Sequence, residues 1–366
     1  MKIMNNSLPE LEVRQYIKNN GFITIDNLMS IALNNTTDSY YRCIDTIGSD
    51  FITAPEISQM FGEIIGLWII EQYQMLGSPK EILLLELGPG SGVLQRDILK
   101  TLQLNDSLFN GLKIYLLDIN NKLILQQKKL LFRYHDKIHW IKNIYSLPNI
   151  PTIVIANEFL DSMPIKQYIK VGGNYYEMTC GISTDNFDII YNKFYGEEFL
   201  CNRFIAIYPN ALDGAIIEES NIALEFVELL SKHLLKNSGS ALFIDYGYNY
   251  IPKIRDSFTF NNSLQSLLNH QYSPIFTCIG QSDLSAHVDF YKLKQAAMNA
   301  GITDILFYTQ KDFLIKYGIL MRLNKLIAHK HNKHVQDILV NQVKRLISKQ
   351  YMGELFKILE LRQHLL

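Results

Sequence analysis

Three glycines at alternate positions could hold a small ligand. Gly88, Gly90 and Gly92 follow the apolar residues 82–87, and a helical pattern begins at Val93. Glycine is needed where the backbone angle φ turns positive or where backbone approaches a ligand closely. The spacing differs from the dinucleotide-binding pattern G-x-G-x-x-G, in which Val93 would be glycine, and no P-loop lysine follows. We therefore expect a loop wrapped over a flat molecule, with a tight turn that binds nothing as the alternative.

Two acidic residues at the ends of predicted strands narrow the choice of ligand. Glu86 would repel a pyrophosphate, but it suits a ligand that carries an ammonium and a sulfonium group. S-adenosyl-L-methionine therefore fits better than NAD or ATP. Asp118 ends the second predicted strand, 26 residues after Gly92. A carboxylate there can accept both hydroxyls of a ribose, and a solvent-facing acid is the alternative.

Other polar residues could act on a second substrate. Asn157, Glu158 and Asp161 follow the apolar run 152–156, and Tyr246 follows a later run. Parallel strands deliver their carboxyl ends to one edge of a sheet, so we expect these side chains to face the ligand crevice. Purely turn-forming roles are the alternative, with Asp161 as the cap of a short helical turn.

The loop 283–290 adds a histidine and two carboxylates. His287 beside Asp289 could act as a base or anchor a substrate. Metal ligation is less favoured because no second histidine is near, and Asp289 could equally cap the helix that follows. The four cysteines form no C-x-x-C pair, so no metal site is predicted.

The elements that must position these residues are short apolar runs that alternate with helix-length segments. Continuous apolar runs separated by helices indicate parallel strands covered on both faces, and hence a doubly wound α/β core. Strands are expected at 82–87, 113–119, 138–144, 152–156, 241–245 and 305–308, and helices at 11–19, 26–33, 55–75, 122–132, 221–236 and 290–299. An amphipathic pattern over 335–361 predicts a mostly helical tail.

The alternation breaks after Pro164. Runs at 165–171 and 175–182 flank Gly172-Gly173-Asn174 and predict a β-hairpin, with a third strand near 187–194. We therefore expect an N-terminal helical cap (1–47) and a main domain (48–366). The main domain contains an inserted hairpin region (165–215) and a C-terminal elaboration (256–366).

The composition excludes several classes of protein. Lys and Arg number 35 and Asp and Glu 36, which gives a formal charge of −1 and argues against an extended nucleic-acid surface. No segment approaches ~18 uncharged apolar residues, so no membrane span is predicted. The N-terminus lacks an apolar leader and the cysteines resemble reduced thiols, so a cytoplasmic location is expected. The oligomeric state is left open.

Five ordered motifs are similar to those of a known family. They are Asp50-Phe-Ile-Thr-Ala-Pro-Glu, Glu86-Leu-Gly-Pro-Gly-Ser-Gly, Ala156-Asn-Glu-Phe-Leu-Asp-Ser-Met-Pro, Ile244-Asp-Tyr-Gly and Asp283-Leu-Ser-Ala-His-Val-Asp-Phe. The chain resembles the MidA-like S-adenosylmethionine-dependent methyltransferases from about Tyr40 to Gly353. Eukaryotic members are mitochondrial protein-arginine methyltransferases that assist assembly of respiratory complex I. The resemblance implies a class I seven-stranded methyltransferase core and a protein substrate, such as a respiratory-chain subunit.

The resemblance also implies which residues act. The cofactor would be held by Phe51, Thr53, Pro55, Glu86, Gly88, Gly90, Gly92 and Asp118. Glu158, Asp161 and Glu218 would orient a guanidinium, and His287 with Asp289 would take up the released proton. Asp118 stands where relatives commonly have Glu, Ser49 where a second glycine is common, and Asn221 where a proline usually follows Glu218. A cofactor-binding assembly factor or chaperone with little turnover is the alternative function.

Overall fold

The computed structural model describes residues 7–44, 53–183, 186–192 and 197–364. The chain separates into two compact units. The core unit comprises Ile44–Leu160, Phe226–Gly247 and Lys294–Leu366, and the accessory unit comprises Met1–Cys43, Asp161–Glu225 and Tyr248–Leu293. The accessory unit thus combines three segments that are distant in the sequence: most of the predicted cap, the inserted hairpin region and the first part of the C-terminal elaboration.

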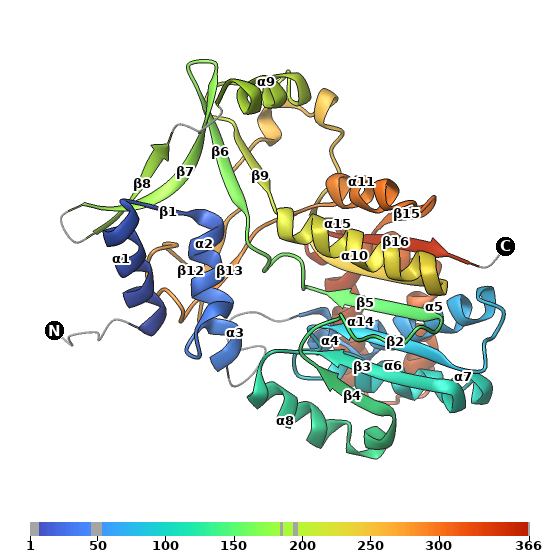
Figure 1. Ribbon diagram of the computed structural model, residues 1–366. Helices are drawn as coiled ribbons and strands as arrows, with labels where there is room; N and C mark the ends of the chain where they lie inside the picture. Colours follow the sequence, from blue (N-terminus) through green and yellow to red (C-terminus); the bar gives the residue numbers. More distant parts are fainter. Residues whose placement is uncertain (1–6, 45–52, 184–185, 193–196, 365–366) are drawn as a thin grey trace. The chain divides into compact units, whose positions relative to one another are not determined.

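The core unit is built on a mixed β-sheet (Figure 1). Seven strands lie in the order β15-β16-β10-β5-β2-β3-β4. Their bounds are β2 Ile82–Leu87, β3 Leu112–Leu117, β4 Ile138–Ile141, β5 Thr152–Asn157, β10 Gly239–Tyr248, β15 Asp304–Thr309 and β16 Phe356–Gln363. The neighbours from β10 to β4 are parallel, whereas β16 is antiparallel to β10 and β15. The predicted α/β sheet is confirmed.

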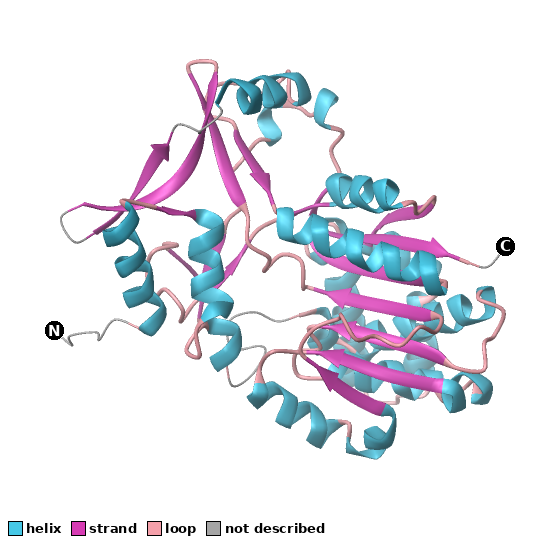
Figure 2. Cartoon of the chain, in the orientation of Figure 1, coloured by secondary structure: helices cyan, strands magenta, loops and turns pink. Residues whose placement is uncertain are grey.

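Helices cover both faces of this sheet (Figure 2). On one face a continuous apolar core joins the sheet to α5 (Gln59–Met75), α6 (Val93–Leu102), α12 (Gln310–Lys316), α13 (Ile319–Ala328) and α14 (Lys333–Ile347). On the other face lies α10 (Asn221–Asn237), whose Leu234 approaches Gly239 of β10. The strands are therefore buried on both sides, which explains why β2 and β5 are apolar without alternation.

The helix expected from Pro55 to Met75 is two helices. α4 spans Ala54–Ile57, and the backbone of the next residue, Ser58, is extended with φ −157°. The Ser58 hydroxyl accepts the N–H of Met60 at 3.3 Å and so caps α5. A serine with this role interrupts an apolar pattern that otherwise reads as one helix.

The expected helical tail is wrong over its last part. Residues 333–347 form α14, but Phe356–Gln363 form β16, which lies between β10 and β15. Periodicity alone does not separate a fully buried strand from a buried helix segment in a short apolar run. The pairing of β16 with two strands decides the outcome.

The accessory unit carries the predicted hairpin. β6 (Lys166–Val171) and β7 (Asn174–Ser183) are joined by Gly172 and Gly173, both in the left-handed region. The hairpin belongs to the sheet β1-β7-β6-β9, with β8 beside β7. The other elements of this unit include α1 Leu8–Asn20, β1 Ile23–Thr24, α2 Ile25–Ser30, a π-helical turn Ile31–Asn35, α3 Tyr40–Cys43, β8 Asn186–Asn192, α9 Glu197–Ile207, β9 Ile216–Glu219, β11 Gln265–Leu268, β12 Gln271–Ser273, β13 Asp283–Ser285 and β14 Val288–Asp289. The helix α11 (Phe290–Ala300) begins in this unit and continues into the core unit, which also contains α7 (Asp106–Gly111) and α15 (Met352–Leu355). Among the described residues, no helix has the length and apolar character needed to cross a membrane.

Candidate functional site

The glycine loop connects β2 to α6 in the core unit. Gly88, Gly90 and Gly92 have φ of 62°, 54° and 83°, a region that other residues rarely adopt. The N–H of Gly88 donates to the carbonyl of Leu117 at 3.0 Å. A Cβ added to Gly88 would lie 3.0 Å from the ring of Phe159. The loop is thus held between the ends of β3 and β5, as expected for the ligand edge of a doubly wound sheet.

Glu86 lies near the base of this loop, one residue before β2 ends. It is 2% exposed, and its Oε2 has no hydrogen-bond partner among the described residues. Burial, and secondarily the charge of Asp118, raise the pKa of Glu86 to about 8. A buried carboxyl with an oxygen that has no hydrogen-bond partner among the described residues fits a ligand that brings a positive charge or a hydrogen-bond donor. The ammonium group of S-adenosylmethionine meets that requirement.

Asp118 is held in one orientation by two hydrogen bonds. Its Oδ1 accepts the N–H of Asn120 at 2.8 Å, and its Oδ2 accepts Nε2 of Gln127 at 2.7 Å. Burial raises the pKa of Asp118 above its ordinary value, although these bonds oppose the shift. The Asn120 side chain also caps α8 (Asn121–Leu130) by accepting the N–H groups of Lys122 and Leu123. The strand-end acid is therefore a fixed acceptor, which suits a ribose.

Sequence reasoning missed Gln127 and Asn120. Gln127 lies on α8, is fully buried, and also contacts the glycine loop through the carbonyl of Gly90 at 2.8 Å. The predicted helix at 122–132 placed this residue on a helix. No feature of the sequence indicates which strand-end carboxylate the Gln127 side chain contacts.

The segment 53–57 lies beside the same loop. Thr53 precedes α4, Pro55 stands in its first turn, and the Glu56 carboxylate accepts the hydroxyl of Ser91. Thr53 and Pro55 belong to the segment that contacts the loop through Glu56. Their role in cofactor binding stays a prediction. Phe51, the other predicted cofactor residue of this segment, lies outside the described residues.

The turn after β5 brings Asn157 and Glu158 to the same end of the sheet. Glu158 has φ of 50°, which is unusual for a residue with a side chain, and its N–H donates to Ile244 at 2.8 Å. Nδ2 of Asn157 donates to Oε1 of Glu158 at 3.1 Å. The Asp245 carboxylate accepts the N–H groups of residues 159 and 160 at 3.2 and 3.0 Å, so it fixes this turn.

Tyr246 follows Asp245 on β10. Its N–H donates to Asp245 Oδ1 at 3.0 Å, and its ring packs edge-on against Phe356 of β16. Tyr246 therefore belongs to the core unit, like Asn157 and Glu158. Its predicted catalytic role stays a prediction.

The other three predicted catalytic residues lie in the accessory unit. The carbonyl of Asp161 accepts the N–H of Ala286 at 2.9 Å, which places it beside the 283–290 loop. Burial lowers the pKa of His287, which favours a neutral imidazole at pH 7. Asp289 accepts the N–H of Lys292 at 3.2 Å, the bond expected of a helix cap at the start of α11. Their predicted roles stay predictions.

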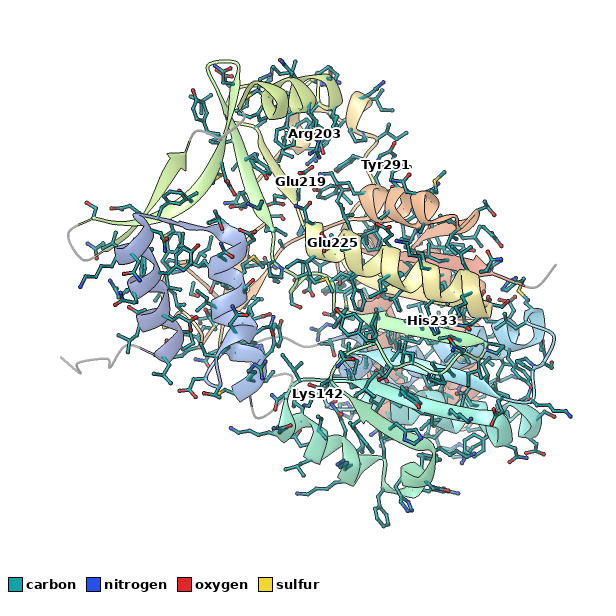
Figure 3. The ribbon with its side chains drawn as sticks, in the orientation of Figure 1. Lys142, Arg203, Glu219, Glu225, His233 and Tyr291 are labelled. Carbon is teal, nitrogen blue, oxygen red and sulfur yellow. The ribbon has the colours of Figure 1, made fainter. Side chains whose placement is uncertain are left out.

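Glu218 of β9 is a buried acceptor within the accessory unit. Its carboxylate accepts hydrogen bonds from Nε2 of Gln167 at 2.8 Å and from the N–H of Ser263 at 3.0 Å. The hydroxyl of Ser263 accepts the N–H of His287 at 2.9 Å. The adjacent Glu219 pairs with Lys292 at 2.8 Å. Glu219 also pairs with Arg203 at 3.2 Å, and both residues are labelled in Figure 3. Glu218 is thus occupied by neighbouring donors and supports the histidine loop.

Known proteins share both the sequence and the fold. A model of a family described as S-adenosyl-L-methionine-dependent methyltransferase matches residues 64–308. The mitochondrial protein arginine methyltransferase NDUFAF7 of Rattus norvegicus is 28% identical and aligns with 98% of this chain and 86% of its own length. The human protein of the same name is also 28% identical, over 95% of this chain and 82% of its own.

A solved structure agrees with these relatives. A candidate methyl transferase from Burkholderia thailandensis, crystallised with S-adenosyl-homocysteine, superposes with a TM-score of 0.84 at 25% identity, over 97% of this chain and 92% of that chain. The class I methyltransferase fold is confirmed. The expected cytoplasmic location is corrected, because the curated relatives are named as mitochondrial proteins. The chain belongs to the S-adenosyl-L-methionine-dependent methyltransferase family, and S-adenosyl-L-methionine is its cofactor.

Proposed function

We propose that this enzyme methylates an arginine side chain of another protein. The observation that carries the proposal is the similarity, over nearly the whole chain, to relatives named protein arginine methyltransferases. The family resemblance further suggests a respiratory-chain subunit as the acceptor. The turn at Glu158 supplies a carboxylate suited to a guanidinium, which supports the same proposal.

The chemistry is a displacement at a methyl carbon. S-adenosylmethionine supplies a methyl group on a sulfonium, and transfer breaks the S–C bond, forms an N–C bond and releases one proton. The nucleophile must lie in line with the methyl group, roughly 3–3.5 Å away, with water excluded. Positioning is therefore the main task of the protein, and we assign Glu86, Asp118 and the glycine loop to the cofactor side.

Glu158 is proposed to orient the acceptor. A carboxylate can accept two parallel N–H groups of a guanidinium, which fixes its plane and holds its charge away from the attacking nitrogen. The donor bond from Asn157 restricts the Glu158 side chain to one arrangement. The left-handed backbone at Glu158 is the kind of strain that persists where the surroundings require it, here through the bonds to Ile244 and Asp245.

Transfer of a labelled methyl group tests the proposal. The protein is incubated with methyl-labelled cofactor and with arginine-containing respiratory subunits or their peptides, and the product is hydrolysed and analysed for methylarginine. Label on arginine supports the proposal. Cofactor binding without label on any protein supports the assembly-factor alternative, and label confined to another residue type overturns the arginine assignment.

A charge-removing variant tests the role of Glu158. Glu158→Gln keeps the shape but lacks the charge, so S-adenosyl-homocysteine binding should persist while turnover falls about ten- to a hundredfold. Glu81→Gln serves as the matched control, because Glu81 is exposed and pairs only with Lys113 among the described ion pairs. Equal turnover in Glu158→Gln and the parent enzyme would remove Glu158 from the acceptor site.

A further inference from the structure

The side chain of Gln127 joins three parts of the cofactor side. Nε2 donates to Asp118 Oδ2 at 2.7 Å and to the carbonyl of Gly90 at 2.8 Å. Oε1 accepts the indole Nε1 of Trp140 at 2.9 Å. One amide therefore connects the end of β3, the middle of the glycine loop and the residue next to the end of β4.

The hydrogen-bonding capacity of this amide is largely used within the protein. An amide NH₂ has two donor hydrogens, and the two bonds from Nε2 use both. The side chain is fully buried, and a Cβ at Gly92 would lie 3.3 Å from Gln127 Cγ, so the packing leaves little freedom of rotation. Gln127 is thus suited to act through Asp118 and Gly90 rather than to bind a ligand itself.

After these bonds are formed, the Asp118 carboxylate can still accept a hydrogen bond from a ligand. An ionised carboxylate offers about four lone-pair positions, two on each oxygen. The N–H of Asn120 uses one position on Oδ1, Gln127 uses one on Oδ2, and the N–H of Ile119 also donates to this carboxylate. About one position remains, which can accept a hydroxyl of a ribose.

We propose that Gln127 is a positioning residue that sets Asp118 and the Gly90 backbone in one fixed geometry for the cofactor. The inference rests on the assignment of Asp118 to the ribose. Without the amide, Asp118 would lose the donor on Oδ2 and could rotate, and the carbonyl of Gly90 would lose its partner. Cofactor affinity should then fall although no group in direct contact with the ligand has changed.

Titration calorimetry with S-adenosyl-homocysteine tests the proposal in the full chain. Gln127→Met keeps the length of the side chain without the amide, and we expect affinity to fall about tenfold at pH 7.5. The matched control is Gln126→Met on the same helix, where affinity should equal that of the parent. Thermal unfolding of each variant reports whether it is folded.

The pH profile separates positioning from general loss of structure. The bond from Gln127 favours the ionised form of Asp118, so Gln127→Met should raise the pH below which affinity declines. Gln127→Glu should bind poorly at pH 8, where two adjacent carboxylates repel. At lower pH the affinity of Gln127→Glu should recover relative to that of Gln127→Met, because a proton shared by the two carboxyls restores a hydrogen-bond donor to Asp118. A purely structural defect would not reverse with pH.

The possible outcomes overturn different statements. If Asp118→Asn binds S-adenosyl-homocysteine with the affinity of the parent, Asp118 does not hold the ribose, and the proposed role of Gln127 loses its basis. Weakened binding in Asp118→Asn with parent affinity in Gln127→Met would overturn the positioning role alone. If Gln127→Met does not fold, Trp140→Phe takes its place, because it removes the donor to Gln127 Oε1. Trp140→Phe should weaken binding with the same shift in pH profile. An unchanged pH profile would overturn the positioning role of Gln127.

Discussion

The buried carboxyl of Glu86 should make the free enzyme less stable as pH rises. Its pKa is about 8 in the folded protein against an ordinary value of 4.5. An acid whose pKa is raised by folding binds its proton more tightly in the folded state, so folding is favoured most below the ordinary pKa. That advantage is lost progressively as pH rises from 4.5 and is gone above about 8.

The magnitude follows from the difference between the two pKa values. Each pKa unit corresponds to about 1.4 kcal/mol, so the whole effect is on the order of 5 kcal/mol. Part of the effect is already lost at pH 6, because this pH lies above the ordinary pKa of 4.5. Between pH 6 and pH 9 the free energy of unfolding should fall by about 3 kcal/mol because of this group.

Urea unfolding of the ligand-free protein measures the effect. The parent and Glu86→Gln are compared at pH 6, 7, 8 and 9, since the amide is close in shape and cannot ionise. The free energy of unfolding of the parent should decline relative to that of Glu86→Gln as pH rises. The exposed Glu81→Gln should follow the parent at every pH.

The same pH dependence in the parent and Glu86→Gln would contradict this prediction. If the free energies of unfolding of the parent and Glu86→Gln change in parallel from pH 6 to pH 9, then Glu86 is ionised in the free protein with an ordinary pKa. Burial would then not raise the pKa of Glu86. The reason for preferring a cationic ligand at this carboxyl would be wrong with it.

Two further variants test the cofactor side. Gly90→Val should abolish S-adenosyl-homocysteine binding in a folded protein, because Gly90 has φ of 54° and a branched side chain resists that conformation; calorimetry showing unchanged affinity would remove the loop from the site. Asp118→Ala should lose about ten- to a hundredfold in affinity, as expected for a charged hydrogen-bond partner, and equal affinity in variant and parent would refute the ribose contact.

The sequence predicted the parts of the site that depend on local pattern. The strand 82–87, the glycine loop and the helix at Val93 are where they were expected, because buried parallel strands and loop glycines leave local signals. The strand-end position of Asp118 follows from the same alternation.

The remaining features depend on contacts between distant residues. β16 is a strand because β10 and β15 both pair with it, and its own residues do not distinguish it from a helix. The bond from Gln127 to Asp118 depends on the angle at which α8 crosses the sheet edge, which no pattern in the sequence specifies. The helix α9, at Glu197–Ile207, was not predicted at all.

The two carboxyls of the cofactor side explain why this glycine loop suits a methyl donor. Glu86 is buried and Asp118 is partly buried, and the charge of Asp118 adds to the upward pKa shift of Glu86. A pyrophosphate at this loop would bring further negative charge to two carboxyls that already repel each other. A ligand with an ammonium and a sulfonium group would instead stabilise the ionised form of Glu86, while its ribose would donate to the acceptor position left on Asp118. Binding of S-adenosylmethionine should therefore strengthen as pH rises toward 8, and affinity that is constant from pH 6 to pH 9 would contradict this account.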